Sequence, residues 1–358
     1  MKTSRLSLKS LEVHAKRRRK FALSFAMSYI RDLEPVIDSR YAILRKQLDY
    51  FAETGEVFDL RKYITYCIVD VLGELAFGEA MGNQEAADPA KIPPVSEAMY
   101  DSCVAALKNI KARVMRPKTG RKDMLGCIMS ATEEKTGEPP TVPQTLVDAF
   151  TLLVGGTHTT GNTLHCLFAN LARSPGSLER FVAEVDERLP PLKPDQGAYG
   201  ITGLEEKLDF VNACIKENFR KDAVATFNMP RSVPPEGAMI DGHFVPGDTQ
   251  CSVNIHAFHH NPAIWGLDQN LFNPNRYSQA RDKDLSSLVM PFSVGQRNCV
   301  GQNLARTNVI RMATTLLRAY EFDFLRTEEP MFMACHGDSD LRTPVMVKVQ
   351  RRGEVFTG

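Results

Sequence analysis

Apolar side chains recur every three or four residues over most of this chain, a period typical of α-helices that bury one face. The period is clearest between residues 57 and 78. A less regular segment, 79–143, is interrupted by two proline pairs. The pattern predicts helices over 7–33, 34–54, 57–78, 95–112, 122–134, 143–173, 177–190, 204–222 and 299–318.

Two stretches, 227–255 and 321–352, lose the helical period and are rich in turn residues. In the first, the run Ile240-Asp-Gly-His-Phe-Val-Pro-Gly separates short apolar pieces by glycine and proline, as β-hairpins do. The second reads as strands and turns that end the chain. The expected fold class is therefore mainly α with small β-sheets.

The longest apolar helical segment, 143–173, has an unusual middle, where Gly155 and Gly156 precede a cluster of threonines. Each glycine costs about 1 kcal/mol relative to alanine inside a helix. Threonine hydroxyls can also bond to preceding carbonyls and bend a helix. One interpretation is a kinked core helix, or a break between two helices. The other is a helix opened locally to admit a ligand and water.

A short loop near the C-terminus contains Phe292, Gly295, Arg297, Cys299 and Gly301, and a helical pattern follows it. The two glycines allow the backbone to approach a flat or bulky group, because neither carries a Cβ. A cysteine at the start of a helix is stabilised as a thiolate by the helix dipole, and the neighbouring arginine can bind a carboxylate. A lone cysteine is more often a buried structural thiol. These residues alone leave both interpretations open.

The 358 residues are 43% apolar and 24% charged, as in ordinary soluble proteins with a substantial core. The net charge of +1 gives no electrostatic reason to expect nucleic-acid binding. Eight cysteines are scattered without zinc-like spacing, which favours reduced thiols over a disulfide framework. No run approaches the roughly 18 apolar residues of a membrane span, and the first residues lack the apolar core of a signal peptide. We therefore expect no transmembrane segment in this chain.

The pattern Phe-x-x-Gly-x-Arg-x-Cys-x-Gly at 292–301 resembles the haem-binding loop of the cytochrome P-450 family at every defining position. The resemblance implies that Cys299 is the proximal thiolate ligand of the iron of haem b. It also implies that Arg297 binds a haem propionate, and that Phe292, Gly295 and Gly301 complete the cofactor-binding loop. A thiolate ligand pushes electron density toward iron and favours O–O cleavage.

The run Gly155-Gly-Thr-His-Thr-Thr160 resembles the oxygen-activation motif of the same family, in which an acid precedes two threonines. Thr159 matches the threonine that orders water and helps to deliver protons in that family. His158 stands where the family has its acid. Because histidine can relay protons near neutral pH, both residues are candidate catalytic residues.

Three further residues resemble the propionate contacts of the family. His14 and Arg18 share one helical face, within the basic run 16–20. Taken alone, that run indicates a solvated surface, or less often a nuclear-localisation or phosphate-binding patch. Arg231 follows a proline, like the propionate-binding arginine beside the sheet in the family. The resemblance therefore adds His14, Arg18 and Arg231 to the candidate cofactor-binding residues.

Glu217-x-x-Arg220 and the Pro-x-Arg sequence that ends at Arg276 resemble a buried triad of the family, which secures the core on the proximal side of haem. Buried charges are tolerated only when they are paired, so we assign these three residues to structure. The histidines of segment 256–260 lack the accompanying acids of a metal site. We interpret them as surface and loop histidines.

The motifs occur in the order of the family from residue 14 onwards. This order predicts a single cytochrome P-450 domain over 1–358, incomplete at its N-terminus, where the membrane anchor and the first helices and sheet are missing. The resemblance implies a haem-thiolate monooxygenase that inserts one oxygen atom from O2 into a small apolar or aromatic molecule. NADPH would supply electrons through a separate P-450 reductase, because the sequence has no G-x-G-x-x-G dinucleotide fingerprint.

The style of the cysteine loop favours a fungal enzyme of secondary metabolism or detoxification. For the family, the resemblance implies the cytosolic face of the endoplasmic reticulum membrane, with membrane association only in a full-length form. Two alternatives remain open. One is a catalytically inactive truncated remnant without stable haem, suggested by the short ends and His158. The other is a haem-thiolate enzyme that rearranges a peroxide or a dehydrated substrate without a reductase.

Overall fold

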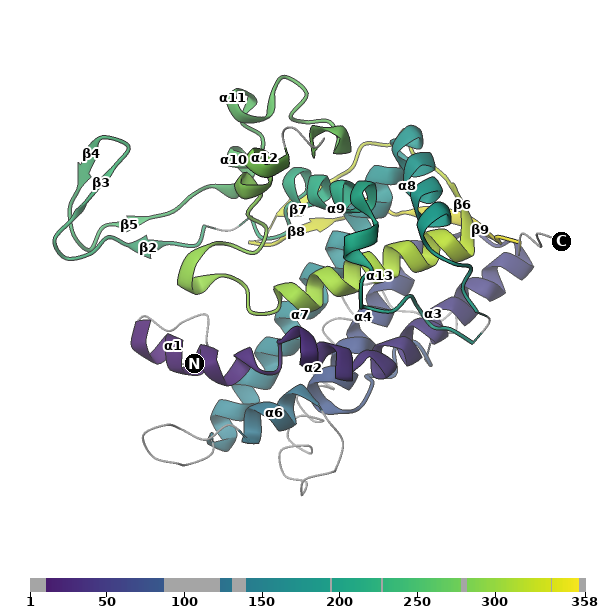
Figure 1. Ribbon diagram of the computed structural model, residues 1–358, viewed down its shortest axis with the longest axis horizontal. Coiled ribbons are helices and arrows are strands. Elements are labelled where there is room, and N and C mark those ends of the chain that lie inside the picture. The colour runs from purple at the N-terminus through teal and green to yellow at the C-terminus, as the bar shows by residue number, and fades with distance from the viewer. Residues whose placement is uncertain are drawn as a thin grey trace.

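The structure is a computed structural model, and it describes residues 11–86, 123–130, 140–193, 195–226, 228–277, 282–335 and 337–353. In this part of the chain, helices dominate (Figure 1). The α-helices of the described ranges are α1 (Leu11–Ala22), α2 (Met27–Asp32), α3 (Glu34–Thr54), α4 (Leu60–Phe77), α6 (Met124–Ser130), α7 (Val142–Ala172), α8 (Pro175–Arg188), α9 (Asp209–Lys221), α10 (Ile255–His259), α11 (Pro262–Trp265), α12 (Asp282–Leu288) and α13 (Gln302–Ala319).

The strands of the described ranges form one three-stranded and three two-stranded antiparallel sheets. Their order is β1-β9-β6, β2-β5, β3-β4 and β7-β8. The strands are β1 (Phe58–Asp59), β2 (Arg231–Ser232), β3 (Ala238–Ile240), β4 (His243–Val245), β5 (Gln250–Cys251), β6 (Tyr320–Phe324), β7 (Met333–Cys335), β8 (Ser339–Leu341) and β9 (Met346–Arg351). The predicted fold class, mainly α with small β-sheets, is confirmed.

Helix ends follow the local signals in the sequence. Helix α3 carries a proline in its first turn and ends at Gly55, whose φ of 69° stops the helix in the left-handed region that glycine tolerates. Helix α7 starts with a capping box. The Thr141 side chain accepts from the Gln144 backbone, and the Gln144 side chain accepts from the Thr141 backbone. The helix predicted over 95–112 lies outside the described residues.

The single helix predicted over 7–33 is wrong, because the chain turns between α1 and α2. There, Ala26 has extended backbone angles (φ −66°, ψ 143°). The hydroxyl of Ser24 donates to the carbonyl of Phe21 at 2.9 Å, and the Phe25 side chain is buried. At this turn the Phe25 ring joins the hydrophobic core. No glycine or proline marks this turn, so the periodic pattern could not reveal it.

Helix α7 is the central element of the body. It packs against α4, α8, α9 and α13, and the ribbon shows it running between them (Figure 1). Every residue from Thr160 to Leu171 is buried. The preceding half of the helix contains exposed positions, which include Val154 and Gly155. The C-terminal half of α7 is therefore part of the core, and its N-terminal half has an exposed face.

His165 lies in the buried half of α7, with its Nε2 3.2 Å from the hydroxyl of Thr65. Burial, assisted by the nearby Arg61 guanidinium, lowers the pKa of His165 to about 3. The unfolded chain binds a proton here below about pH 6.5, whereas the folded chain does so only near pH 3. The folded state therefore loses stability as the pH falls below about 6.5.

Between pH 7 and pH 5, the expected loss in the free energy of unfolding from this residue is about 2 kcal/mol. Urea unfolding at the two pH values measures it. In His165→Gln, which keeps a polar partner for Thr65, the loss should shrink by that amount. An equal loss in both proteins would show that His165 is not the responsible group.

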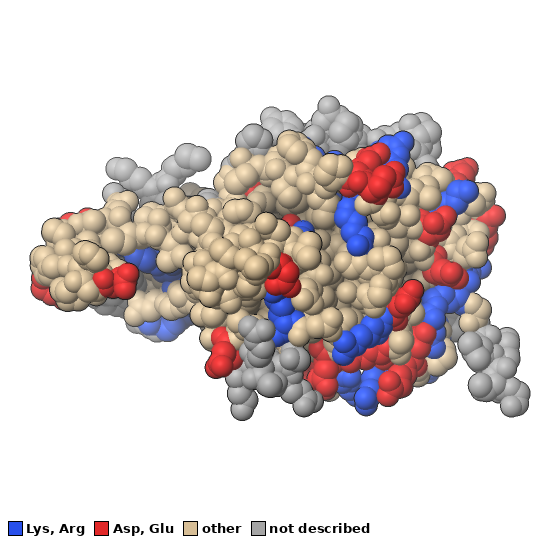
Figure 2. Space-filling model, turned by 90° about the horizontal axis from the view of Figure 1, so that it is seen from above, with Lys and Arg blue, Asp and Glu red and all other residues tan. Residues whose placement is uncertain are grey.

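The β2–β5 segment forms an arm that projects from the body (Figure 1). Met239, Ile240 and Phe244 are exposed on its outer hairpin, β3–β4. Seen from above, the arm presents mainly uncharged atoms with a few acidic residues, whereas charges of both signs crowd the body (Figure 2). The strand pairing predicted for 227–255 is thus confirmed. In the described ranges, no helix is long and apolar enough to cross a membrane.

Candidate functional site

The loop before α13 is closed by two backbone hydrogen bonds. The Cys299 amide donates to the carbonyl of Phe292 at 2.8 Å, and the Asn298 amide donates to Gly295 at 3.1 Å. Gly295 has a φ of 74°, and nothing lies within 4 Å of where a Cβ would stand. The side chain of Cys299 is exposed on this closed loop. The interpretation of Cys299 as a buried structural thiol is therefore wrong.

Cys299 does not begin the helix, as the sequence pattern suggested. Gly301 is the N-cap, and α13 starts at Gln302. The influence of the helix dipole falls off within the first turn, so the dipole contributes less to Cys299 than predicted. A Cβ at Gly301 would stand 3.8 Å from the sulfur of Cys299 and 3.5 Å from the ring of Phe25. Glycine here keeps the space beside the sulfur open.

Two successive arginines of α1 connect this loop to α7. Arg17 Nη2 lies 2.9 Å from Asp148 Oδ1, which belongs to α7. Arg18 Nη1 donates to the backbone carbonyl of Asn298 at 2.6 Å, and its Nη2 donates to the Asn298 side chain. These contacts join segments about 130 and 280 residues apart in the chain. The cysteine loop and the first half of α7 are therefore held by the same helix.

The candidate propionate-binding residues differ in the hydrogen bonds that their side chains already make. His14 is buried. Arg231 donates to the carbonyl of Met229 at 2.9 Å and to Ser293 Oγ, within the cysteine loop, at 3.3 Å. Arg297 is half-buried, and among the described residues its guanidinium has no hydrogen bond or ion pair. The structure thus brings Arg18, Arg231 and Arg297 to one loop, and it leaves the last available for a carboxylate.

Helix α7 is continuous through both glycines, so neither a break nor a local opening is present. The hydroxyls of Thr157, Thr159 and Thr163 each donate to the carbonyl four residues earlier. An apolar helix would normally bury its large side chains, but Phe150 and Val154 are 38% and 42% exposed. Beside them, an added Cβ on Gly155 would meet nothing within 4 Å. This stretch is an open apolar face that ends about one turn before Thr159.

His158 contacts two carboxylates that the sequence did not indicate. Its Nδ1 is 3.9 Å from Asp338 Oδ2, and its Nε2 is 3.8 Å from Asp340 Oδ1. Asn162, one turn further along α7, explains their position. Its Nδ2 donates to the carbonyl of Ser339, and its Oδ1 accepts from the amide of Leu341, both at 2.8 Å. The Asn162 amide thus binds the β8 backbone in the way that a neighbouring strand would.

The environments of these two carboxyl groups differ. Burial raises the pKa of Asp338 above its ordinary value, and His158 opposes part of that rise. Burial acts in the same direction on Asp340, but His158 and Arg342 outweigh it, so the pKa of Asp340 is lowered. Arg342 Nε lies 2.9 Å from Asp340 Oδ2. Asp340 is therefore held as an anion, and Asp338 more readily carries a proton.

The structural triad is confirmed. Glu217 and Arg220 are fully buried, with Arg220 Nε and Nη2 each 2.8 Å from a Glu217 oxygen. Arg276 Nε lies 3.1 Å from Glu217 Oε1, and Arg276 Nη1 lies 2.7 Å from Asp268 Oδ1. Asp268 was not expected from the sequence. Every charge in this group has an opposite partner, as burial requires.

His259 corrects the interpretation of the histidines in 256–260 as surface and loop residues. All three lie on or beside α10, and His259 is fully buried. Its Nε2 accepts from the backbone amide of Met290 at 3.2 Å, just before the cysteine loop. Burial lowers its pKa to about 4, so the ring is neutral near pH 7 and can accept this bond. His259 therefore positions the loop.

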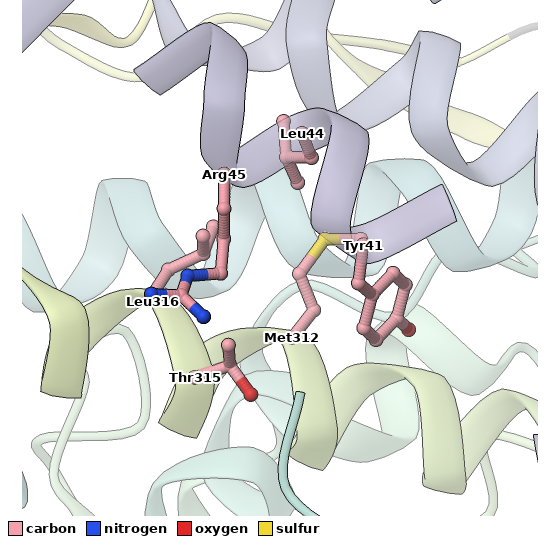
Figure 3. Close-up of a pocket in the computed structure, with 6 residues that line it drawn as sticks. All are labelled: Tyr41, Leu44, Arg45, Met312, Thr315 and Leu316. Carbon is pink, nitrogen blue, oxygen red and sulfur yellow. The ribbon is translucent and has the colours of Figure 1, made fainter. Parts of the chain in front are cut away.

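A small pocket between α3 and α13 lies apart from these residues (Figure 3). Its lining residues are Tyr41, Leu44, Arg45, Met312, Thr315 and Leu316. The space between these side chains is too narrow to hold a water molecule. Beside it, the buried Arg311 donates to the carbonyl of Tyr199 at 2.6 Å and pairs with Glu34 and Asp38. This seam is a packing feature and not a substrate site.

A model of the family Cytochrome P450 matches residues 91–348, which is most of the chain. The chain belongs to this family. A solved cytochrome P450, CYP102L1, superposes with a TM-score of 0.80 over 97% of this chain and 84% of its own, at 18% sequence identity. This match confirms the predicted cytochrome P450 fold.

Two curated relatives of this cytochrome P450 come from fungi. Cytochrome P450 monooxygenase 1 of Neocamarosporium betae is 27% identical over 348 residues, which cover 90% of this chain and 70% of the relative. The monooxygenase penB of Penicillium thymicola is 29% identical over 238 residues, which cover 65% of this chain and only 52% of the relative. The predicted family and enzyme class, cytochrome P450 monooxygenase, are confirmed.

The cytochrome P450 family implies haem iron, and the described residues fit it. Cys299 presents a sulfur ligand on the surface of a closed loop. No side chain fills the space beside Gly155 and Gly295, which suits the close approach of a flat macrocycle. Arg297 has a guanidinium available for a carboxylate such as a propionate. The individual roles of the site residues stay predictions.

Proposed function

We propose that this chain binds haem b through Cys299 and inserts one oxygen atom from O2 into a small apolar or aromatic molecule. NADPH supplies the electrons through a separate reductase. The observation that carries this proposal is the exposed Cys299 on a loop that α1 joins to the open apolar face of α7. When bound, haem supplies the oxygen-activating iron, and a thiolate ligand favours O–O cleavage.

The residues of the chain divide the remaining tasks. Arg297 binds a propionate, and Arg231, Arg18 and His14 support it from β2 and α1. Phe292 fixes the loop to α9 through an edge contact with Phe219, at 5.2 Å between ring centroids. These groups would hold the cofactor at the cysteine loop.

Helix α7 provides an apolar wall and a hydroxyl. Phe150 and Val154 offer apolar surface that a hydrophobic substrate covers while it displaces water. Thr159 and His158 follow one turn later, and they hold and move protons beside the reacting oxygen. Phe150 and Val154 would thus form the substrate-binding surface, and Thr159 and His158 would deliver protons.

The basic residues of α1 suit a docking face for an acidic redox partner. Arg19 is exposed, and Lys20 is half-buried. Opposite charges steer such partners together and set their orientation. We place the enzyme on the cytosolic face of the endoplasmic reticulum, as the family resemblance implies, and in fungal secondary metabolism.

A specific observation favours the second candidate, an inactive remnant without stable haem. Arg18 is already bound to Asn298, and His14 is buried, so both side chains would have to rearrange before they reached a propionate. The difference spectrum of the reduced protein with and without carbon monoxide separates the two candidates. A strongly red-shifted Soret band supports the monooxygenase, and a protein that takes up no haem is the remnant.

Replacing Thr159 by Ala should raise the hydrogen peroxide released per NADPH consumed. The expected rise is roughly tenfold, below the 10²–10⁴-fold effect of a direct general acid, because the hydroxyl orders water instead. The matched control is Thr151→Ala on the same helix, where the hydroxyl also donates to the carbonyl four residues earlier. Peroxide yields that change equally in both variants would indicate a general effect on the helix.

A further inference from the structure

His158 is placed between two carboxylates that come from the other side of a packing interface. It lies on α7, whereas Asp340 is in β8 and Asp338 immediately precedes that strand. The side chain of His158 is 24% exposed, and those of Asp338 and Asp340 are 38% and 28% exposed. The cluster is therefore partly exposed to solvent. His158, one of its members, is next to Thr159 in the sequence.

The arrangement is set by the fold and not by chance surface proximity. Asn162 fixes β8 to α7 with two hydrogen bonds of 2.8 Å. On the far side of β8, the amide of Ser339 donates to the carbonyl of Val224 at 2.7 Å, and Asp338 pairs with Ala225 in an isolated β-bridge. Both carboxylates thus stand on a backbone that is bonded from two sides.

The charged groups around the cluster lie closer to Asp340 than to Asp338, because Arg342 pairs with Asp340. Arg342 is the residue after β8. His165 lies about two helical turns after His158 on α7, and burial keeps its ring neutral. Arg61, from α4, donates to the carbonyl of Leu341 and is paired with Asp59. Cys335 of β7 lies near Asp338. Among these neighbours, Arg342 is the cation that directly contacts a carboxylate of the cluster.

The two ring nitrogens of His158 each face a carboxyl group. An imidazolium has two N–H donors and satisfies both sides, whereas neutral imidazole has only one. The distances of 3.8 and 3.9 Å are longer than hydrogen bonds, and a small side-chain movement or a bridging water closes them. Two carboxyl groups whose environments push their pKa values apart can take different acid and base roles. Here the pKa of Asp338 is raised and that of Asp340 is lowered.

We propose that Asp338 supplies the acid that position 158 lacks, and that His158 passes its proton toward Thr159 while Asp340 holds the ring. This inference rests on the proposed function. The family motif puts an acid on the helix itself, whereas this chain puts a base on the helix and takes the acid from the residue that precedes β8. Asp338 and Asp340 are positioning residues, because they act through His158.

The proton balance of one passage is simple. The carboxyl of Asp338 gives its proton to Nδ1 of His158, and the Nε2 proton, at first held toward Asp340, leaves toward the water ordered by Thr159. A solvent proton then restores the Asp338 carboxyl, and ring rotation or water exchange resets the two nitrogens. No electron moves in these steps, and no bond other than N–H and O–H bonds changes.

The first test needs no turnover. Carboxyl carbons of aspartate, labelled with ¹³C in the reduced carbon monoxide-bound protein, report the titration of Asp338, assigned by its loss in Asp338→Asn. Removing His158 in His158→Gln should move the Asp338 midpoint upward, because His158 opposes the effect of burial. His243→Gln on the arm is the control. An unchanged midpoint would overturn the coupling between the two residues.

The second test measures NADPH oxidation with a P450 reductase. Asp338→Asn and His158→Gln should each slow it about 10²-fold, the lower end for a general acid. The double variant should be no slower than either single variant, because both act on one path. Asp323→Asn, an exposed carboxylate of β6, is the control. Rates equal to the parent, or independent losses that multiply, would overturn the relay.

The carbon monoxide spectrum distinguishes the two levels of failure. A parent chain without the red-shifted band overturns the proposed function, and with it the relay, even if the aspartate titrations are coupled. A normal band in every variant with unchanged rates overturns the relay alone. Equal haem content across the variants excludes a folding defect as the cause of any slow rate.

Discussion

Replacing Cys299 by Ser is expected to abolish the red-shifted Soret band of the reduced, carbon monoxide-bound protein. A serine hydroxyl does not ionise in the way that a thiol does, and it is a poor substitute for the soft sulfur ligand. NADPH-dependent product formation should be lost with the band. The measurement is the difference spectrum after expression with a haem precursor, with haem content determined separately.

Cys335→Ser is the matched control for this substitution. Cys335 is also exposed, but it lies in β7, where its sulfur is 3.0 Å from the hydroxyl of Thr226. Its replacement should leave the spectrum unchanged. Because Cys299 is exposed, its substitution should change the free energy of unfolding by no more than about 0.5 kcal/mol. A red-shifted band that survives in Cys299→Ser would show that another group ligates the iron.

Local signals in the sequence predicted most helices and the position of the cysteine loop. Helix α7 is an example, because an apolar period, a capping box and a run of threonines all lie within one segment. The break between α1 and α2 was missed because no glycine or proline marks it. It depends on the burial of Phe25 against residues that are distant in the chain. Tertiary packing, not local propensity, decides such a turn.

The parts of the site that the sequence did not reveal are its long-range polar contacts. Asp338 and Asp340 are about 180 residues from His158, and neither belongs to a recognisable motif. Their approach depends on Asn162, which binds the β8 backbone. The pairing of Arg17 with Asp148 is hidden for the same reason. A sequence pattern shows which residues can do chemistry, but the packing of elements decides which residues meet.

The structural triad and the cysteine loop are connected through one such contact. Arg220 Nη1 donates to the carbonyl of His259 at 2.7 Å, and the ring of His259 accepts from the amide of Met290 at 3.2 Å. Met290 directly precedes the loop that carries Cys299. A residue that the sequence assigns only to structure therefore also affects how firmly the sulfur ligand is held.

Replacing Arg220 by Met should lower the free energy of unfolding by about 3–5 kcal/mol, the effect of removing one partner from a buried ion pair. The variant leaves the buried Glu217 with one arginine, and it removes the donor to the carbonyls of His259 and Gln269. Urea unfolding of the haem-loaded protein measures the change.

The control is Arg351→Met, which removes an ion pair with Asp49 at 2.7 Å in which the arginine is 52% exposed. Exposed pairs contribute about 0–1 kcal/mol, so this variant should stay close to the parent. If the triad also positions the loop, the Arg220 variant should lose haem faster than the control at a urea concentration where both remain folded. Equal rates of haem loss would confine the triad to stability, and equal unfolding free energies would show that the buried charges do not depend on Arg220.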